Sequence, residues 1–412
     1  MLLITFLTVL SLTLIGYYVS RDIFSPFVIQ PGVWFAIIGL YYIVQPAYFP
    51  ICHDLPICVS LWCLSFAVGA YVVYVKLPAE RGLLSAQSFF LAGDLKPSRT
   101  VLKVYFLLSV VTIPLMLYML INKALNRGEG NIFLYLRVSV IDDTLERPDF
   151  GLANYLVPLV LVLLVFVMMY VKSKKAKVAV VVLNILAGVL TMSKTSFFVV
   201  LIVILYVLYM RKKIKAQTIG LWMLIFVAFS VGFQFLRGMG QGDDDTFSVF
   251  DMLALYTMSP LVAFDYYAVP GGATFFGENV FRIYYAVMHT LGSDIRPVDN
   301  ILKFVGVPDL TNTYTILYPF YTDFGLAGVT IFGAVYGAFF GFLYKRSDGG
   351  NSYYKALYAC FINYLALQFV QENFFYNLSL NIQYIVFFII PYVFSTPLLS
   401  RRTKPLPHAT ED

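Results

Sequence analysis

Residues 152–171 read LANYLVPLVLVLLVFVMMYV, and the basic run KSKKAK follows at 172–177. The first of these segments carries no charge over about 20 residues, the length that a helix needs to cross the hydrocarbon core of a bilayer. The rest of the chain has the same character, since 60% of its 412 residues are hydrophobic and only 13% are charged. Such values are typical of membrane proteins with several spans, so no soluble fold is needed.

Other apolar stretches of comparable length recur along the chain. Together with 152–171 they predict about eleven spans, at 2–19, 27–50, 57–76, 101–122, 152–171, 176–193, 196–210, 218–236, 325–344, 356–370 and 376–397. The predicted fold class is an all-α polytopic membrane protein, with residues 1–412 forming a single integral membrane domain. The first stretch lacks a basic n-region and a small-residue cleavage site, so we interpret it as a retained span.

Basic residues mark one side of the predicted membrane domain. They follow the odd-numbered spans: Lys172 and Lys174 follow the fifth, and Arg211 and Lys212 follow the seventh. The positive-inside rule makes this side cytoplasmic, which places the N-terminus outside and the C-terminus in the cytoplasm. Because topology accounts for the net charge of +6, no nucleic acid partner is expected.

The same alternation places the longest polar stretch, 237–312, on the outer face as one large loop. It opens with Arg237 at the end of an apolar span, at the depth where a lipid-linked phosphate would arrive. Three aspartates at 243–245 follow, which hold a divalent cation or simply remain solvated. Residues 246–270 are apolar but contain Pro260, which favours a re-entrant or surface segment over another span.

Residues 278–291 predict an amphipathic helix that lies on the membrane or on the helix bundle. Apolar side chains recur at three- and four-residue intervals, while Arg282 and His289 share the opposite face. The polar loop that follows contains three more charged residues, Asp294, Arg296 and Asp299. A solvated face is one interpretation of this pattern. The other is an anion-binding and acid–base site, with His289 as the first choice of base.

Two other outer segments supply candidate cations. Arg137 lies within an apolar stretch of the outer loop 123–151, where an isolated charge needs a partner or an anion. Lys194 lies in a tight outer turn between two spans, against the general trend of basic residues. Anion binding is the functional interpretation of both residues, and ordinary loop charge is the alternative.

Cys52 and Cys58 flank a short outer turn. A disulfide between them is one hypothesis, because disulfides persist in an oxidising outer compartment. A zinc site that includes His53 and Asp54 is the alternative, but the spacing matches no established metal pattern. The sequence therefore predicts no resident metal and no cofactor.

Tyrosine and hydroxyl side chains gather at 311–328, at the mouth of the predicted span 325–344. Tyr314 and Tyr318 suit sugar stacking and hydrogen bonding, although tyrosine is also a common interfacial anchor. Asp323 stands next to the bilayer, where a carboxylate is costly unless it is paired. We therefore expect a structural or a glycan-binding role for Asp323.

This stretch resembles bacterial oligosaccharide repeat-unit polymerases of the Wzy type. The pattern at the end of their large periplasmic loop is similar to Asn312-Thr313-Tyr314-Thr315 followed by Tyr318, Tyr321, Asp323-Phe324-Gly325 and Gly328. Their short outer turn is similar to Ser193-Lys194-Thr195-Ser196, although an arginine is commoner there. The similarity in span layout covers nearly the whole chain.

The resemblance implies a bacterial inner-membrane enzyme that polymerises undecaprenyl-diphosphate-linked repeat units at the outer face into O-antigen or exopolysaccharide. It also implies contact with membrane lipids and work alongside a chain-length regulator and a flippase. The candidate diphosphate-binding residues are Arg237, Arg282, Arg296, Arg137 and Lys194. The candidate catalytic residues are His289, Asp294 and Asp299, and the candidate glycan-binding residues are Tyr314, Tyr318 and Asp323.

Two rival functions stay open. A transporter or lipid-glycan flippase should place its polar residues within helices around a central cavity, whereas the charges here gather in loops on one side. The second rival is an O-antigen ligase, which moves glycan to a lipid core. In this sequence, only the tyrosine pattern favours the polymerase over the ligase.

Overall fold

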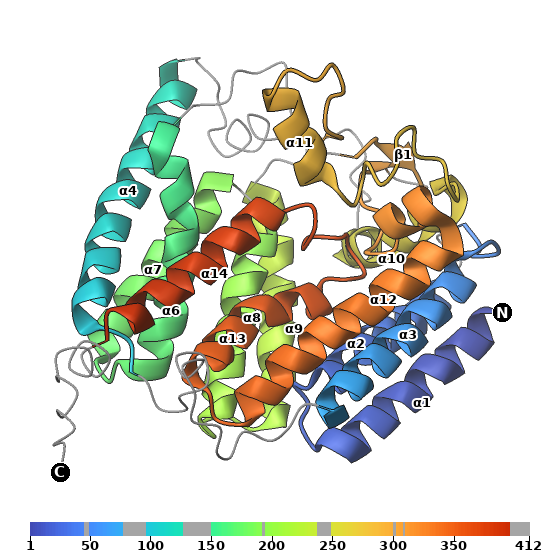
Figure 1. Cartoon of the computed structure of the whole chain (residues 1–412), viewed down its shortest axis with the longest axis horizontal. Coiled ribbons are helices and arrows are strands. Elements are labelled where there is room, and N and C mark those ends of the chain that lie inside the picture. The colour runs from blue at the N-terminus through green and yellow to red at the C-terminus, as the bar shows by residue number, and fades with distance from the viewer. Residues whose placement is uncertain are drawn as a thin grey trace, which may run out of the picture. The chain divides into compact units, whose positions relative to one another are not determined.

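The computed structural model describes residues 1–44, 49–76, 96–126, 150–191, 194–236, 249–299, 302–307 and 310–395, and these are largely helical (Figure 1). The helices are α1 (Leu2–Ser20), α2 (Pro26–Val44), α3 (Leu55–Lys76), α4 (Arg99–Asn126), the 3-10 helix η2 (Gly151–Leu156), α6 (Val157–Tyr170), α7 (Lys174–Thr191), α8 (Lys194–Met210), α9 (Ala216–Leu236), α10 (Val249–Tyr267), α11 (Arg282–Thr290), α12 (Tyr318–Asp348), α13 (Ser352–Ala366) and α14 (Leu378–Val393). In these ranges, the strands β1 (Val305–Gly306) and β2 (Leu310–Thr311) pair antiparallel as one small sheet.

An observed helix overlaps each apolar stretch that was predicted as a span. Within the described ranges, six helical segments are long and apolar enough to cross a membrane: Leu2–Ser20, Pro26–Ile43, Leu55–Lys76, Arg99–Asn126, Gly151–Tyr170 and Tyr318–Asp348. Shorter apolar helices occupy Lys194–Met210, Ala216–Ser230 and Leu378–Val393. These helices confirm an all-α membrane fold, while a total of eleven crossings stays a prediction.

The chain folds into two compact units. Unit 1 comprises Met1–Pro78, Tyr209–Lys345 and Phe361–Asn381, and unit 2 comprises Ala79–Leu208, Arg346–Cys360 and Ile382–Asp412. Most of the polar residues singled out in the sequence belong to unit 1.

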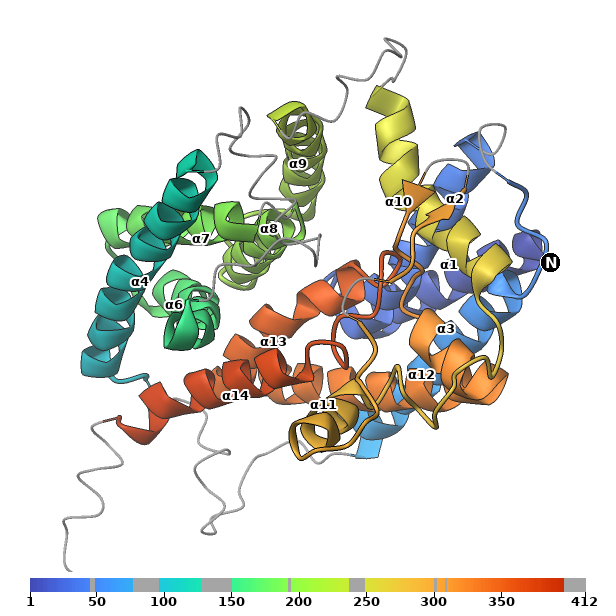
Figure 2. The same ribbon diagram turned by 90° about the horizontal axis from the view of Figure 1, so that it is seen from above.

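Close helix packing in unit 1 depends on glycines. On α12, Gly333, Gly337 and Gly341 follow one another at four-residue intervals and lie against α3. A Cβ atom placed on Gly337 would come within 2.0 Å of the carbonyl oxygen of Phe66, and one on Gly341 within 2.7 Å of that of Ala70. Small residues at this spacing let two backbones approach closely, as in membrane helix pairs. Figures 1 and 2 show α3 and α12 side by side.

The N-terminal part of α12 is set off from the rest of the helix at Gly325. This residue has φ of 61° and ψ of −149°, a backbone conformation that is essentially restricted to glycine. The helical turn from Tyr318 to Phe324 therefore takes its own direction before the long apolar part begins. The side chains of Tyr318 and Asp323 lie on this separate turn.

The segment predicted to be re-entrant or to lie on the surface forms the helix α10. It continues through Pro260, and the residues from Met258 to Asp265 are buried. It contacts α2 and α3, and Figure 2 shows it beside α2. No re-entrant turn occurs within α10, which packs as a continuous helix against α2 and α3.

Unit 2 contains its own helix cluster. The helices α4, α6 and α7 contact one another. The amide of Asn184 on α7 donates to the carbonyl oxygens of Val160 (3.1 Å) and Val180 (2.8 Å), which satisfies a polar group buried between helices. Lys194, at the first position of α8, belongs to this unit.

Candidate active site

The predicted amphipathic helix is present as α11, and its apolar face is exposed. It begins at Arg282 rather than at 278, because Gly277 has φ of 64° and residues 278–281 form turns. Tyr285 faces the protein and its hydroxyl donates to the carbonyl of Phe276 at 2.7 Å. The apolar side chains remain on the outside, with Val287 52% and Leu291 77% exposed. An outward apolar face is typical of a helix that lies on a bilayer surface.

Arg282 is the best-defined cation of the predicted site. Its Nε donates to the carbonyl oxygen of Val298 at 2.5 Å, which ties α11 to the polar loop that follows it. Among the residues that the structure describes, no acceptor contacts its two terminal nitrogens. Burial lowers the pKa of the guanidinium, and the neighbouring Tyr376 and Asp299 oppose that shift. Arginine nevertheless stays charged at neutral pH, so a half-buried cation is held here with most of its donors unused.

Tyr376 was not singled out in the sequence, and it is near enough to Arg282 for each group to affect the pKa of the other. Its hydroxyl oxygen is buried, and it has no hydrogen-bond partner within the described ranges. Burial raises the pKa of this phenol, with Tyr318, Glu372 and Asp323 acting in the same direction and Arg282 in the opposite one. The group therefore remains protonated at neutral pH. A buried hydroxyl without a partner is uncommon in proteins and invites a ligand or a water molecule.

Glu372 holds the backbone turn at 374–376, which carries Tyr376. Its carboxylate accepts hydrogen bonds from the backbone N–H groups of Phe374 (2.7 Å), Phe375 (2.9 Å) and Tyr376 (2.9 Å), and from the hydroxyl of Tyr336. Burial raises the pKa of Glu372, and these hydrogen bonds lower it. The carboxylate is thus fully engaged in shaping the turn that leads into α14.

Two segments far apart in the sequence meet to build this region. The N–H groups of Thr315 and Ile316 donate to the carbonyls of Val370 (3.0 Å) and Gln368 (2.8 Å). Thr315 has φ of 66°, which a β-branched residue adopts only when the surrounding structure imposes it. This pairing carries the tyrosine-rich segment at 311–318 to the turn that holds Tyr376.

The three predicted glycan-binding residues lie on this segment and on the turn after it. The rings of Tyr314 and Tyr318 pack with centroids 4.7 Å apart, and the Tyr314 hydroxyl donates to the carbonyl of Lys303 at 2.7 Å. Asp323 accepts from the side-chain amide of Asn279 (2.6 Å) and from the backbone N–H of Val280 (2.9 Å). Asp323 therefore holds the turn that precedes α11, whereas Tyr318 remains half-buried near Tyr376.

The predicted acid–base residues are solvent-exposed. His289 Nδ1 lies 2.9 Å from the carbonyl oxygen of Ser293, so its Nδ1–H donates there and Nε2 is left as the basic nitrogen. Asp294 and Arg296 are exposed in the following loop, and Asp299 is exposed beside Arg282. The structure thus brings Asp299, among the three candidate bases, next to the cation.

Three of the predicted cations are not among the described residues of unit 1. Arg137 and Arg237 fall outside the residues that the structure describes, and Lys194 belongs to unit 2. Their proposed part in anion binding stays a prediction.

The disulfide hypothesis for Cys52 and Cys58 is wrong. Both residues are free thiols. The helix α3 begins at Leu55, so Cys58 is one turn inside it, with its side chain buried in the bundle, while Cys52 is exposed in the preceding loop.

Tyr376 and Glu372 are the residues that sequence reasoning missed. A signal existed, because a carboxylate at 372 between two apolar stretches requires partners. Nothing local in the sequence shows that Tyr376 interacts electrostatically with Arg282.

One family model matches most of the chain. The family model described as "Putative O-antigen polymerase" matches residues 22–369, which include Arg282, Tyr318 and Asp323 and end just before Glu372. No curated protein and no solved structure matches the chain. Because the family match covers most of the sequence, the chain belongs to the O-antigen polymerase family.

Proposed function

We propose that this protein transfers a growing glycan from a lipid diphosphate carrier onto the next lipid-linked repeat unit, at the outer face of the bacterial inner membrane. Family membership supports the coarser part of this statement, a glycosyltransferase-like polymerase of polysaccharide repeat units. The apolar helices make the protein a multi-pass membrane protein. The carrier, undecaprenyl diphosphate, and the outer location are our proposal.

The observation that carries the proposal is that Arg282 and Tyr376 interact electrostatically and that both have donors without a described acceptor. In the transfer, the bond between the anomeric carbon and the diphosphate breaks, and negative charge develops on a phosphate oxygen. A cation and an uncharged hydroxyl donor stabilise such an oxygen when they are held in place before the reaction. Arg282 has unused terminal donors and Tyr376 has a buried hydroxyl without a described partner.

The apolar outer face of α11 supports a carrier that is a lipid. Leu291 and Val287 project away from the protein while Arg282 on the same helix points inward. An isoprenoid chain in the membrane would lie beside the exposed side chains, and its diphosphate would reach the guanidinium at headgroup depth. Arg237, Arg296, Arg137 and Lys194 are proposed as further phosphate ligands.

The acceptor sugar needs a base near the departing diphosphate. Asp299 is our preferred candidate because it lies beside Arg282, and His289 with its free Nε2 is the second. Asp294 is the third. We assign sugar binding to Tyr318, whose half-buried ring packs at a tilt against Tyr314, and a positioning role to Asp323.

The direct test uses purified full-length protein and a lipid-diphosphate-linked repeat unit, with product length resolved on a gel. The wild-type protein is expected to produce a ladder, and Arg282→Ala to reduce turnover by about a hundredfold or more, as the loss of one oxyanion donor does. Lys213→Ala, which removes an exposed charge after α8, serves as the matched control.

If Arg282→Ala produced a ladder like that of the wild-type protein, the region around Arg282 would not be the active site. If the wild-type protein moved glycan to a lipid core without lengthening it, the ligase function would replace the polymerase.

A further inference from the structure

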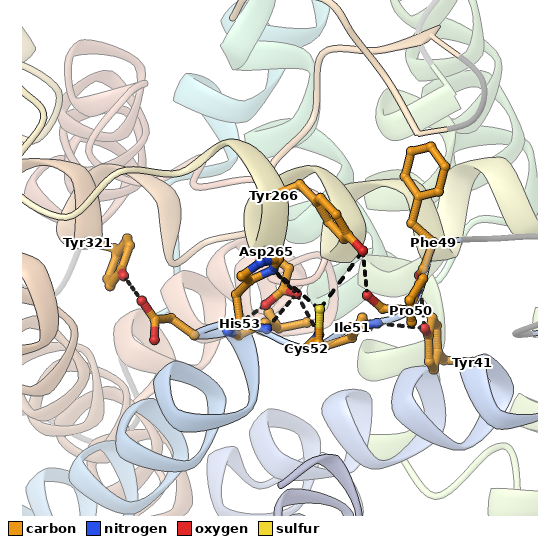
Figure 3. Close-up of polar contacts among 11 residues, drawn as sticks. Tyr41, Phe49, Pro50, Ile51, Cys52, His53, Asp265, Tyr266 and Tyr321 are labelled. Carbon is orange, nitrogen blue, oxygen red and sulfur yellow. Dashed lines mark hydrogen bonds and ion pairs between the residues drawn. The ribbon is translucent and has the colours of Figure 1, made fainter.

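The outer end of α10 gathers three side chains of the kinds that bind metal ions. They are Cys52 and His53, from the loop before α3, and Asp265, on α10 (Figure 3). One ligand atom from each lies within 4.8 Å of the other two. The His53 Nδ1 atom is 3.7 Å from Cys52 Sγ and 3.2 Å from Asp265 Oδ2.

These separations fit one tetrahedral ion. Zinc binds sulfur, imidazole nitrogen and carboxylate oxygen at about 2.3, 2.1 and 2.0 Å, and tetrahedral angles then separate sulfur from nitrogen by about 3.6 Å and nitrogen from oxygen by about 3.4 Å. The observed distances differ from these values by only a few tenths of an ångström. The third separation, from the sulfur to the carboxylate of Asp265, is within 4.8 Å, so the three groups are already gathered around one point.

Asp265 is already arranged as a supported ligand. Its carboxylate is buried and accepts three backbone hydrogen bonds, from Cys52 (2.9 Å) and His53 (3.0 Å) at Oδ2 and from Leu55 (3.0 Å) at Oδ1. A carboxylate offers about four lone-pair sites, and these bonds take two on Oδ2 and one on Oδ1, so an ion on Oδ2 would take the place of the His53 Nδ1 contact there. Metal-binding carboxylates are commonly oriented by such hydrogen bonds.

The other two ligands are open to solvent, so an ion can enter. Cys52 is exposed and the side chain of His53 is 53% exposed, and the Tyr266 hydroxyl lies 4.0 Å from the sulfur. Three protein ligands with a fourth position left for water is an arrangement that zinc accepts. A thiolate and an imidazole together favour zinc over calcium or magnesium, which take oxygen ligands.

We propose that Cys52 Sγ, His53 Nδ1 and Asp265 Oδ2 bind one zinc-like divalent ion. The ion replaces the contact between His53 and Asp265 and bridges the loop before α3 to the end of α10. Asp54, within the same loop, accepts a hydrogen bond from Tyr321 on α12, so the ion also braces the turn that carries Tyr318 and Asp323. This site is separate from the proposed transfer chemistry and does not depend on it.

Cobalt is the probe of choice, because Co²⁺ bound tetrahedrally to a thiolate gives visible ligand-field bands and a near-ultraviolet charge-transfer band. Full-length protein is purified in detergent with a tag that contains no histidine, stripped with chelator and kept reduced. We expect saturation at one Co²⁺ per chain, loss of the spectrum when Zn²⁺ is added, and a higher unfolding temperature with Zn²⁺.

Substitutions at the two exposed ligands test the assignment without removing a buried group. Cys52→Ser and His53→Gln should each weaken Co²⁺ binding by at least about tenfold and abolish the rise in unfolding temperature. Cys360→Ala, which removes a buried thiol outside this cluster, and His289→Gln should leave binding unchanged. No thiolate band in the wild-type protein, or an undiminished band in both Cys52→Ser and His53→Gln, would overturn the proposal and leave His53 and Asp265 as a simple ion pair.

Discussion

In Arg282, one nitrogen of the guanidinium holds the local structure, and the other two are available to bind a ligand. Its Nε donates to the carbonyl of Val298, while its terminal nitrogens have no acceptor among the described residues. Tyr376 and Asp299, the carboxylate beside it, both favour the charged form of the guanidinium. Asp323, Glu278 and Glu372 accept hydrogen bonds from backbone N–H groups and shape turns.

Replacing Arg282 with lysine tests whether geometry or charge matters. Lysine keeps the charge but offers no planar fork and has no Nε–H directed at Val298, so we expect Arg282→Lys to recover little of the activity lost in Arg282→Ala. The measurement is turnover of a lipid-linked repeat unit by protein present at equal levels in the membrane. Recovery to near wild-type turnover would show that a point charge is sufficient and that bidentate binding is not used.

Replacing Tyr376 with phenylalanine removes only the hydroxyl. If that hydroxyl donates to the developing phosphate charge, its loss costs about 1.5–3 kcal/mol, or a reduction of about tenfold to hundredfold in kcat. Because the hydroxyl has no described partner in the folded protein, the unfolding temperature should not fall.

Tyr155→Phe, at a tyrosine that is 60% exposed on η2, is the control for Tyr376→Phe. A lower unfolding temperature with unchanged kcat in Tyr376→Phe would assign its hydroxyl to structure instead of catalysis.

At the scale of elements, backbone-to-backbone contact between α3 and α12 sets the position of the site. The turn that carries Tyr318 and Asp323 is the N-terminal continuation of α12, and α12 is aligned by its glycines against Phe66 and Ala70. The segment at 368–370 is held to the same bundle, because the Gln368 side chain accepts from Trp62 and donates to the carbonyl of Gln30.

A single methyl group should disturb this contact. In Gly337→Ala the new Cβ would lie 2.0 Å from the Phe66 carbonyl oxygen, so α3 and α12 must separate. We expect a loss of stability of about 1–3 kcal/mol or more, typical of an overpacked interface, seen as a lower unfolding temperature in detergent.

Gly220→Ala is the matched control for Gly337→Ala. It adds the same methyl group in α9, where nothing lies within 4 Å, and should be neutral or slightly stabilising. Equal unfolding temperatures for the two variants would contradict the proposed tight packing.

At the scale of the whole molecule, the distribution of charge predicts the orientation in the membrane. The candidate site, the metal-ligand cluster and the exposed face of α11 all fall in segments that the positive-inside rule places outside the cytoplasm. The short basic loops after α6 and α8 should then face the cytoplasm.

Reporter fusions can check this topology. Fusions after Arg81, Lys175 and Lys213 are expected to report a cytoplasmic location, and a fusion after Leu291 an outer one. The reason is the cost of carrying clustered Lys and Arg across the membrane. An outer location at any two of the first three positions would reverse the orientation.

The sequence by itself determined where the helices lie and what kind of protein they build. A long uncharged run such as 152–171 has to form a helix in lipid, because every backbone N–H and C=O group needs a partner within the segment. The amphipathic pattern around Arg282 is local in the same sense, so α11 was predictable, although its start was shifted by Gly277.

Only the tertiary structure decided which side chains meet. Thr315 pairs with Val370 across more than fifty residues of chain, and this contact joins the tyrosine-rich segment at 311–318 to the segment that leads to Tyr376. The same holds for Asp265, which accepts hydrogen bonds from a loop over two hundred residues earlier in the sequence. Periodicity reports only on neighbours within a helix or strand, so contacts between distant segments follow from packing and cannot be derived from local pattern.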